Sequence, residues 1–274
     1  MKTNYVQAPL PFQGQERRFL KHFKEVLNNF SPTATYIDLF GGSGLLSHTV
    51  KQYFPDAKVV YNDFDNYSQR VANIDKTNSL LSDIRSICAK SPQRKTRLSE
   101  ELRAEIIGAI EKEKGFIDWV TLSSNLLFSM NYVNSLEQLK KEHFYNKIRF
   151  SDYNASGYLK GVKIVRKDYQ DLFKEYSNEK DLVLLVDPPY LSTDCSTYSH
   201  PDYWRLSDYL NVLKILENNS YFYFTSNKSQ IIELCEWIGK NTSVQNPFKG
   251  ATTHKVNTSL TYNASYEDIM IYKR

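Results

Sequence analysis

The apolar residues of this chain fall into short runs that are separated by segments with helical spacing. Residues 182–186, Leu-Val-Leu-Leu-Val, form an unbroken apolar run, which is typical of a strand buried on both faces of a parallel sheet. Further apolar runs lie at 35–40, 58–61, 162–165 and 221–224, with helical segments between them. This alternation predicts an α/β fold with a parallel sheet.

The segment 35–61 predicts one strand-helix-strand unit. Its first strand breaks into a glycine-rich turn at 41–44, and a helix then continues to about Tyr53 before the second strand begins. Apolar residues also recur at helical spacing over 15–28, so we expect a helix ahead of this unit. The tail at 268–272 predicts one more strand, antiparallel and at the sheet edge.

In the middle of the chain the strand signals stop, and charged helical stretches such as 98–113 and 136–143 replace them. The α/β rhythm resumes afterwards, which is typical of an insertion within one domain. We therefore expect a Rossmann-like sheet domain made of 1–66 and 161–274, with a mainly helical lobe inserted at 67–160.

The composition permits a nucleic-acid partner without requiring one. The chain has 35 Lys+Arg against 31 Asp+Glu, a formal net charge of +4. The densest basic run, at 93–97, either contacts phosphates or forms an ordinary solvated face. Aromatic residues make up 14% of the chain, and rings that stack on bases are one use for them beside core packing.

The three cysteines indicate a reducing compartment. Cys88, Cys195 and Cys235 are too few and too scattered for a disulfide framework, and their spacing does not suggest a zinc site. The first residues lack an apolar signal core, and no apolar run approaches the ~20 residues of a membrane span. We expect a cytoplasmic enzyme without a metal and without a membrane partner.

A glycine-rich turn at Gly41, Gly42 and Gly44 lies between the first strand and its helix. Glycines let the backbone approach a ligand, and a helix start offers free N–H groups. Asp63, at the end of the second strand, could accept both hydroxyls of a ribose, so these residues predict a nucleoside cofactor. A dinucleotide is disfavoured because Ser47 stands where the last small residue of the GxGxxG pattern belongs. The alternative is a glycine turn beside an ordinary surface acid.

Asp187, Pro188, Pro189 and Tyr190 directly follow the apolar run at 182–186. The amino group of a base is a poor nucleophile because its lone pair is delocalised into the ring. A carboxylate from Asp187 and the carbonyl of Pro188 can accept its two N–H bonds and localise that lone pair. Tyr190 can stack on the base, which must flip out of a duplex. The motif predicts methylation of such an amino group, and a turn without a chemical role is the alternative.

These two motifs, in this order and with a helical insertion between them, make the chain similar to the adenine-specific DNA methyltransferases of the Dam type, alpha group. The resemblance implies an S-adenosylmethionine methyltransferase sheet, with S-adenosylhomocysteine as product and N6-methyladenine in double-stranded DNA as the result. It implies catalytic roles for Asp187, Pro188, Pro189 and Tyr190. The cofactor-binding residues that it implies are Phe12, Gly14, Asp38, Phe40, Gly41, Gly42, Gly44, Asp63, Asp168, Tyr169 and Asp187.

Some positions need separate comment. Glu16 stands where that family usually carries a lysine, which leaves Arg17 and Arg18 to supply positive charge. Asp168 is by itself a typical helix N-cap, whereas the family order favours a contact with the cofactor adenine. Asp38 is placed to approach the methionine ammonium group.

Two aromatic groups have open interpretations. Residues 223–227 could line the base pocket or serve in the core and as a cap. Tyr198, Tyr203 and Trp204 could order around DNA or pack onto the sheet.

The resemblance implies DNA as partner, with the inserted lobe reading the target sequence, and we expect a monomer. Methylation of cytosine N4, of RNA or of a protein amide on the same fold is an alternative, as is a catalytically silent DNA-binding relative. Asp187 favours adenine, because serine is more usual before the two prolines in cytosine enzymes and asparagine in glutamine enzymes. A cognate restriction endonuclease and a solitary role are both open.

Overall fold

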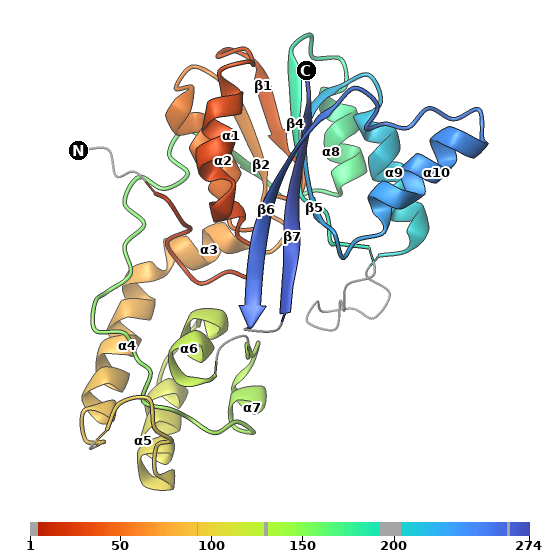
Figure 1. The fold of residues 1–274 in the computed structure, drawn as a ribbon. Helices are drawn as coiled ribbons and strands as arrows, with labels where there is room; N and C mark the ends of the chain where they lie inside the picture. Colours follow the sequence, from red (N-terminus) through yellow and green to blue (C-terminus); the bar gives the residue numbers. More distant parts are fainter. Residues whose placement is uncertain (1–4, 92, 129–130, 192–203, 262–263) are drawn as a thin grey trace. The chain divides into compact units, whose positions relative to one another are not determined.

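The structure is a computed structural model that describes residues 5–91, 93–128, 131–191, 204–261 and 264–274. The chain divides into two compact units, which we call the helical unit and the sheet unit (Figure 1). The helical unit comprises Met1–Gln15 and Asp65–Tyr158, and the sheet unit comprises Glu16–Phe64 and Leu159–Arg274.

The sheet unit is built around one sheet of seven strands. The strands are β1 (Thr35–Asp38), β2 (Lys58–Asn62), β3 (Lys163–Val165), β4 (Leu182–Val186), β5 (Ser220–Ser226), β6 (Thr252–Thr261) and β7 (Ala264–Lys273). Their order across the sheet is β3-β2-β1-β4-β5-β7-β6, and β1 to β5 are parallel. The strands expected from the apolar runs are therefore confirmed, as is the α/β class.

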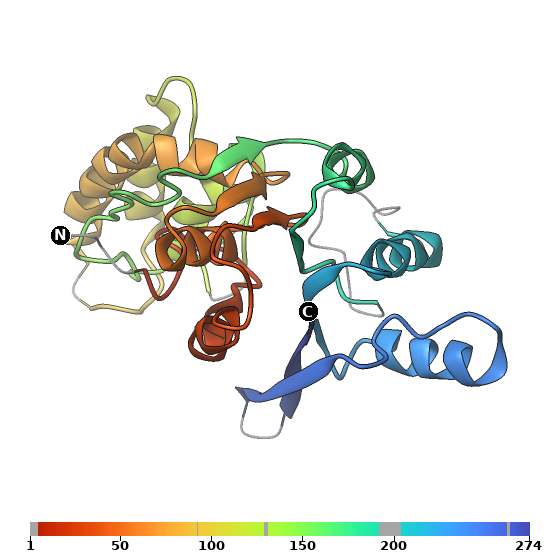
Figure 2. The same ribbon diagram turned by 90° about the horizontal axis from the view of Figure 1, so that it is seen from above.

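Helices cover both faces of this sheet (Figures 1 and 2). They are the 3-10 helix η1 (Glu16–Arg18) and the α-helices α1 (Leu20–Leu27), α2 (Leu45–Tyr53), α8 (Tyr169–Tyr176), α9 (Leu206–Leu216) and α10 (Ile231–Asn241). Successive side chains of a strand point to opposite faces. On β4, Val183 and Leu185 pack with α1 and α2, whereas Leu184 and Val186 pack with α8, α9 and α10. This two-sided burial explains why the β4 sequence is apolar without alternation.

The C-terminal strands differ from the prediction in one respect. β7 is antiparallel to β5 as expected, yet it is not at the sheet edge, because β6 pairs with its other side. The sequence of β6, Thr-Thr-His-Lys-Val-Asn-Thr-Ser-Leu-Thr, contains few apolar residues, so its strand character was missed. A strand at a sheet edge needs fewer apolar side chains than a central one, and polar residues there discourage pairing with other chains.

The helical unit packs its helices around a core of its own. The helices are α3 (Tyr67–Ala72), α4 (Ile74–Cys88), α5 (Glu100–Glu111), α6 (Trp119–Leu126) and α7 (Leu136–Leu139). Leu81, Ile84, Ile106 and Leu122 are completely buried in this core. Across the described ranges of both units, no helix combines the length and apolar character that crossing a membrane requires.

Two expected helices are shorter than predicted. The helix expected over 15–28 is divided into η1 and α1, and the N–H of Phe19 donates to the Glu16 carbonyl at 3.0 Å. The helix expected over 136–143 ends at Leu139 as α7.

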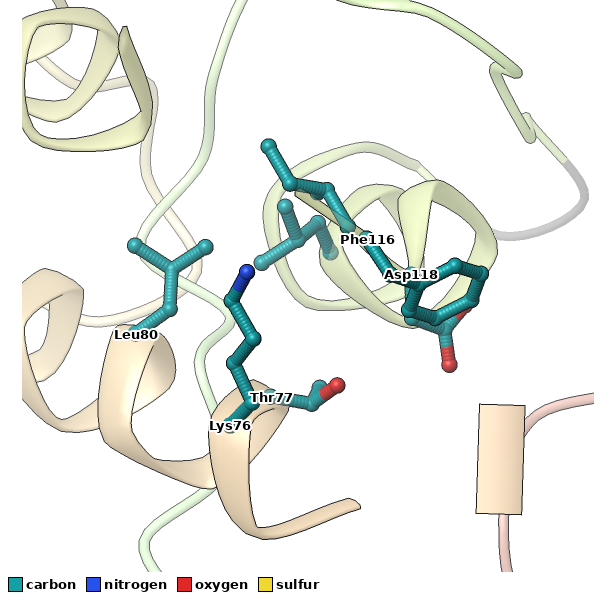
Figure 3. Close-up of a pocket in the computed structure, with 7 residues that line it drawn as sticks. Lys76, Thr77, Leu80, Phe116 and Asp118 are labelled. Atoms are coloured by element: carbon teal, nitrogen blue, oxygen red, sulfur yellow. The ribbon is translucent and has the colours of Figure 1, made fainter. Parts of the chain in front are cut away.

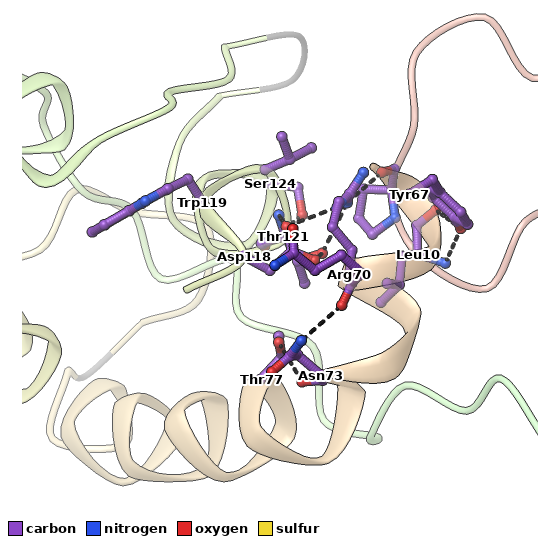
Figure 4. Close-up of polar contacts among 12 residues, drawn as sticks. Leu10, Tyr67, Arg70, Asn73, Thr77, Asp118, Trp119, Thr121 and Ser124 are labelled. Carbon is purple, nitrogen blue, oxygen red and sulfur yellow. Dashed lines mark hydrogen bonds and ion pairs between the residues drawn. The ribbon is translucent and has the colours of Figure 1, made fainter. Parts of the chain in front are cut away.

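A buried ion pair fastens the N-terminal segment to α3 and α6 (Figure 4). The Nε of Arg70 lies 2.9 Å from Asp118 Oδ1, and both side chains are nearly inaccessible to solvent. Arg70 Nη2 also donates to the Pro11 carbonyl at 2.8 Å. Asp118 caps α6 by accepting from the N–H of Thr121 at 3.0 Å, so one carboxylate serves both the cation and the helix start.

The helical unit contains a cavity of about 10 Å³ beside this pair (Figure 3). It is lined by Lys76, Thr77, Leu80, Phe116, Ile117, Asp118 and Leu122. This volume is about that of one water molecule, so the cavity cannot hold a nucleoside.

Replacing Arg70 by alanine should lower the free energy of unfolding by about 3–5 kcal/mol, because it leaves Asp118 as an uncompensated buried charge. Urea denaturation of the two proteins measures this difference. The matched control is Arg97→Ala, which breaks an exposed pair with Glu100 at 3.0 Å and should cost less than about 1 kcal/mol. Equal, small losses in both variants would contradict the assignment.

Candidate functional site

The carboxyl ends of β1 and β4 form the centre of the candidate site. In this sheet, β1 is followed outward by β2 and β3 on one side and by β4 and β5 on the other. Open α/β sheets bind ligands outside the carboxyl ends of the strands at such a switch point. β1 ends at Asp38, opposite Leu185, and Asp187 follows the end of β4. The structure thus brings Asp38 and Asp187 together, and the charge of Asp38 acts on Asp187.

The predicted glycine turn lies between β1 and α2. Gly42 and Gly44 have φ angles of 49° and 73°, in the left-handed region that favours glycine. The N–H of Gly44 donates to the Gly41 carbonyl at 2.6 Å, and α2 begins at the next residue. A Cβ atom on Gly41 would lie 2.1 Å from Cδ2 of Tyr61, so only glycine fits beside that ring.

Tyr61 is a site residue that we did not predict from the sequence. Its hydroxyl donates to the Gly42 carbonyl at 2.7 Å and lies 3.0 Å from Oδ1 of Asp63. Asp63 is only 3% exposed, at the end of β2. One phenol therefore connects the glycine turn with the predicted ribose-binding acid. The only signal in the sequence was the position of Tyr61 just before Asp63.

Asp38 is a buried carboxyl group whose two oxygens have different surroundings. Its Oδ2 accepts from Ser47 Oγ at 2.7 Å, while its Oδ1 has no hydrogen-bond partner within the described part of the chain. Burial raises the pKa of Asp38 to about 7, and the Ser47 contacts lower it by less. A cationic ligand group beside Oδ1 would satisfy this atom and favour the ionised carboxylate. Ser47, which excluded a dinucleotide motif, serves here to orient Asp38.

Asn62 joins the ends of three strands. Its Nδ2 donates to the carbonyls of Leu39 and Lys167 at 3.0 and 2.9 Å, and its Oδ1 accepts from the N–H of Lys167 at 2.9 Å. These contacts hold the chain after β3 against the glycine turn. The next residue, Asp168, is exposed and caps α8 by accepting from the N–H of Gln170 at 2.8 Å. The N-cap interpretation of Asp168 is confirmed, and its predicted contact with a cofactor stays a prediction.

An aromatic cluster lies beside the glycine turn. The ring of Phe40 lies 5.2 Å from that of Tyr169 and 5.5 Å from that of Trp204, measured between centroids. Tyr169 and Trp204 face each other at 5.7 Å. Trp204 thus packs onto the sheet unit, which was one of its two expected roles. Phe40 and Tyr169, both predicted cofactor residues, are brought together.

Asp187, Pro189 and Tyr190 are partly buried, and Pro188 is buried. Burial, and next the charge of Asp38, raises the pKa of Asp187 to about 8. Burial also raises the pKa of the Tyr190 phenol well above its usual range, and the charges of Glu16 and Asp187 add to this. The phenol therefore stays neutral, and a positive charge arriving nearby would favour ionised Asp187.

The structure adds Glu16 to this group. Glu16 is 9% exposed, and its carboxyl group and that of Asp187 interact electrostatically. Burial, and next the charge of Asp187, raises the pKa of Glu16 well above its usual range. In the sequence the only signal was an acid at a position where the Dam-type family carries lysine. Of the two arginines expected to supply positive charge, Arg18 pairs with Asp268 at 3.5 Å.

Two predicted cofactor residues lie in the other unit. Phe12 and Gly14 belong to the helical unit, where the ring of Phe12 packs edge-on against Tyr67 with centroids 5.7 Å apart. Gly14 has a φ angle of 75°, and no atom of the described residues lies within 4 Å of where its Cβ would be. Their contact with a cofactor stays a prediction. Tyr198 and Tyr203 lie outside the described residues.

The segment 223–227 takes core and turn roles. Tyr223, Phe224, Thr225 and Ser226 are buried in β5. Asn227 then exchanges hydrogen bonds with the Glu267 backbone at 2.9 and 3.0 Å. The first four residues of this segment therefore pack in the core, and Asn227 pairs with the chain of β7.

Comparison with known proteins agrees with this arrangement. The family described as D12 class N6 adenine-specific DNA methyltransferase matches residues 12–209 of the chain. A protein from Haemophilus influenzae named "Putative methyltransferase" is 40% identical over 278 residues, which cover 99% of this chain and 94% of that protein. The family match includes both the glycine turn and the motif at 187–190.

The contact between Gly41 and Tyr61 leads to a stability prediction. Gly41→Ala should lower the free energy of unfolding by about 1–3 kcal/mol, because the added methyl group overlaps the Tyr61 ring. Gly108→Ala is the control: among the residues that the structure describes, none has an atom within 4 Å of the added Cβ in α5, so the change should stabilise by about 0.5–1 kcal/mol. Urea denaturation measures both, and unchanged stability of Gly41→Ala would show that the turn tolerates a side chain.

The raised pKa of Asp38 predicts how stability changes with pH. The usual value is 3.8 and the folded value about 7, so between them the folded state keeps a proton that the unfolded state has lost. Stability contributed by this group therefore falls as pH rises. We expect the stability of Asp38→Asn relative to the parent protein to increase by about 2–3 kcal/mol between pH 5 and pH 8.

Thermal and urea unfolding at several pH values measure this difference. The control is Asp56→Asn, which removes a carboxyl group at an exposed position of the same unit. A difference for Asp38→Asn that does not change with pH would contradict the raised pKa.

Proposed function

Because the chain belongs to the D12 class N6 adenine-specific DNA methyltransferases, we propose that Asp187, Pro188 and Tyr190 hold the target adenine and that the glycine turn seats S-adenosylmethionine. The enzyme methylates N6 of adenine in DNA. We propose in addition the roles of individual residues, S-adenosylmethionine as the methyl donor and double-stranded DNA as the substrate.

The observation that carries the residue assignment is the position of Asp187. It follows β4 directly, beside the end of β1, where the charge of Asp38 reaches it. An amino group held by Asp187 would therefore lie next to the turn that is proposed to seat the methyl donor. A nucleophile and an electrophile held at one edge of a sheet gain from proximity, which is worth as much as ~7–11 kcal/mol in well-aligned systems.

The amino group of adenine needs help because its lone pair is delocalised into the ring. The carboxylate of Asp187 and the carbonyl of Pro188 can accept its two N–H bonds, which favours a more tetrahedral nitrogen. Tyr190, neutral because its pKa is raised, can stack on the base and hold its plane. A base in a duplex would have to flip out to reach these groups. The proton released from the nitrogen can pass through Asp187 to water.

The cofactor residues of the sheet unit suit a sulfonium nucleoside. S-adenosylmethionine, when bound, supplies a methyl group on a positively charged sulfur. Oδ1 of Asp38, buried and without a partner among described atoms, suits the methionine ammonium group. Asp63 is proposed to accept the ribose hydroxyls, and Phe40 and Tyr169, whose rings pack together, are proposed to contact the adenine ring. Asp168 is proposed beside Tyr169, at the exposed start of α8.

The helical unit is proposed to read the target sequence in double-stranded DNA. The ring of Phe150 in this unit is 75% exposed. The guanidinium carbon of Arg94 lies 4.1 Å from the centroid of that ring. Arg149 lies 3.9 Å from the ring of Tyr153 in the same unit. Arginines paired with aromatic rings suit phosphates and unstacked bases. We further propose that the protein acts as a monomer, since the sheet unit holds residues proposed for both the amino group and the methyl donor. We also propose that it acts in the cytoplasm.

Tritiated S-adenosylmethionine and unmethylated genomic DNA, followed by digestion to nucleosides, test the proposal. We expect label in N6-methyldeoxyadenosine. Asp187→Ala should lower turnover by at least about a hundredfold, because a preorganised acceptor is lost, while cofactor binding measured by calorimetry changes much less. Asp181→Ala, at the exposed amino end of the same strand, is the matched control and should keep the parent activity.

Three results would overturn parts of this proposal. Label only in cytosine or in RNA would reject the substrate. Absence of cofactor binding in the parent protein would reject S-adenosylmethionine. Unchanged turnover of Asp187→Ala would reject the assigned role of that carboxylate.

A further inference from the structure

Ser47 and Asp38 form a hydrogen-bonded pair beside the glycine turn. The Oγ of Ser47 donates to Oδ2 of Asp38 at 2.7 Å. Asp38, the last residue of β1, is 1% exposed, and Ser47 is fully buried two residues after α2 begins at Leu45. The pair therefore joins the strand before the turn to the helix after it.

The Ser47 hydroxyl acts on another element and not on its own helix. A serine or threonine inside a helix commonly donates to the carbonyl four residues earlier. Thr49 on the same helix follows this pattern, because its Oγ1 donates to the Leu45 carbonyl at 2.7 Å. Ser47 instead donates to a carboxyl group on β1. Its contact thus bears on Asp38.

The packing of α2 sets the position of Ser47. Leu46 and Val50 lie one turn apart on this helix and are buried in the same hydrophobic cluster as Tyr36 of β1. The N–H of His48 donates to the Gly44 carbonyl at 2.8 Å, so the first turn of the helix is hydrogen bonded. The helix and its core contacts therefore direct the Ser47 hydroxyl toward the end of β1.

This hydrogen bond distinguishes the two oxygens of Asp38. The carboxyl group of an aspartate rotates about a broad, two-fold torsion, so either oxygen can take either place. Oδ2 accepts from Ser47, whereas Oδ1 is buried and has no hydrogen-bond partner among the residues described. Buried polar atoms are normally hydrogen bonded. Oδ1 is therefore the oxygen that suits a donor from a ligand.

The same hydroxyl favours the charge that a cationic ligand group requires. Burial raises the pKa of Asp38 to about 7, and the hydrogen bond from Ser47 lowers it by a smaller amount. Loss of the hydroxyl would allow the carboxyl group to keep its proton to a higher pH, and a neutral carboxyl group attracts a cation less strongly. Orientation and ionisation thus act in the same direction.

We propose that Ser47 is a positioning residue that gives the site its preference for the α-ammonium group of the cofactor, by holding Oδ2 of Asp38 so that Oδ1 accepts from that group. This inference rests on the proposed binding of the methionine ammonium group to Asp38. Ser47 itself does not touch the cofactor in this arrangement. A serine that only stabilised the fold would have no effect on such a preference.

Two ligands that cannot donate a methyl group measure the preference. One is S-adenosylhomocysteine, and the other is its analogue in which hydrogen replaces the α-amino group. Calorimetry on the intact protein at pH 8, above the pKa of Asp38, gives the Kd of each. The parent protein should bind S-adenosylhomocysteine at least about tenfold more tightly, because the analogue cannot donate to Oδ1.

Ser47→Ala should reduce this preference. We expect it to weaken binding of S-adenosylhomocysteine about fivefold to tenfold and to change the Kd of the analogue by less than about twofold. Ser47→Cys keeps a weaker donor and should give an intermediate preference. In turnover assays, KM for S-adenosylmethionine should rise while kcat changes by less than about threefold, because the ammonium contact is the same in the ground and transition states.

Thr49→Val is the matched control. It removes another buried hydroxyl of α2 whose hydrogen bond has the same length but leads to the helix backbone. Both Kd values should stay within about twofold of the parent values, since this hydroxyl does not donate to Asp38. Circular dichroism and urea denaturation show that each variant is folded and how much stability it has lost.

The outcomes separate this inference from the proposed function. A parent protein that binds neither compound would overturn the proposed cofactor and this inference with it. Equal binding of both compounds by the parent would overturn the role of Asp38 on which the inference rests. If the parent prefers S-adenosylhomocysteine and Ser47→Ala keeps the full preference, or weakens both compounds equally, the positioning role of Ser47 alone is wrong. An equal loss in Thr49→Val would also reject that role and assign the effect to helix stability.

Discussion

Parallel pairing of β1 with β4 is the constraint on which the rest of the site depends. The two strands are far apart in the sequence, yet their register places Asp38 opposite Leu185 and so brings the residues after each strand to one edge. The backbone ladder, and not a contact between side chains, sets this juxtaposition. β2 and β5 extend the sheet in opposite directions from this pair, and open α/β sheets generally bind ligands at such a switch point.

The same strand pairing brings acidic side chains into a buried region, where their ionisation costs free energy. Burial raises the pKa values of Asp38, Asp187 and Glu16, and the charge of Asp38 raises that of Asp187 further. A fold under selection for stability alone would not gather carboxyl groups in this way. Groups whose pKa values are displaced by burial and by a defined neighbour are typical of active sites. Binding of a positively charged cofactor would offset this cost, which couples the cofactor to the charge state of the site.

The shape of the glycine turn depends on steric fit and not on charge. Gly41 faces the Tyr61 ring from the neighbouring strand, and the Tyr61 hydroxyl donates to the next carbonyl of the turn. The Tyr61 side chain therefore restricts the conformation of the turn, and the left-handed φ angles of Gly42 and Gly44 allow the chain to bend there. A turn whose conformation is already held by such contacts loses less entropy when a ligand binds.

The sequence by itself determined the strands with strong apolar runs, the glycine turn, the motif at 187–190 and the family, because these depend on local composition and spacing. It missed β6, whose polar residues are tolerated only because pairing with β7 supplies its backbone partners. It also left Glu16 and Tyr61 unassigned. Only the tertiary structure decided that the charge of Asp187 acts on Glu16 and that Tyr61 contacts Gly42, because the sheet and its helices bring together residues that are separated in the sequence.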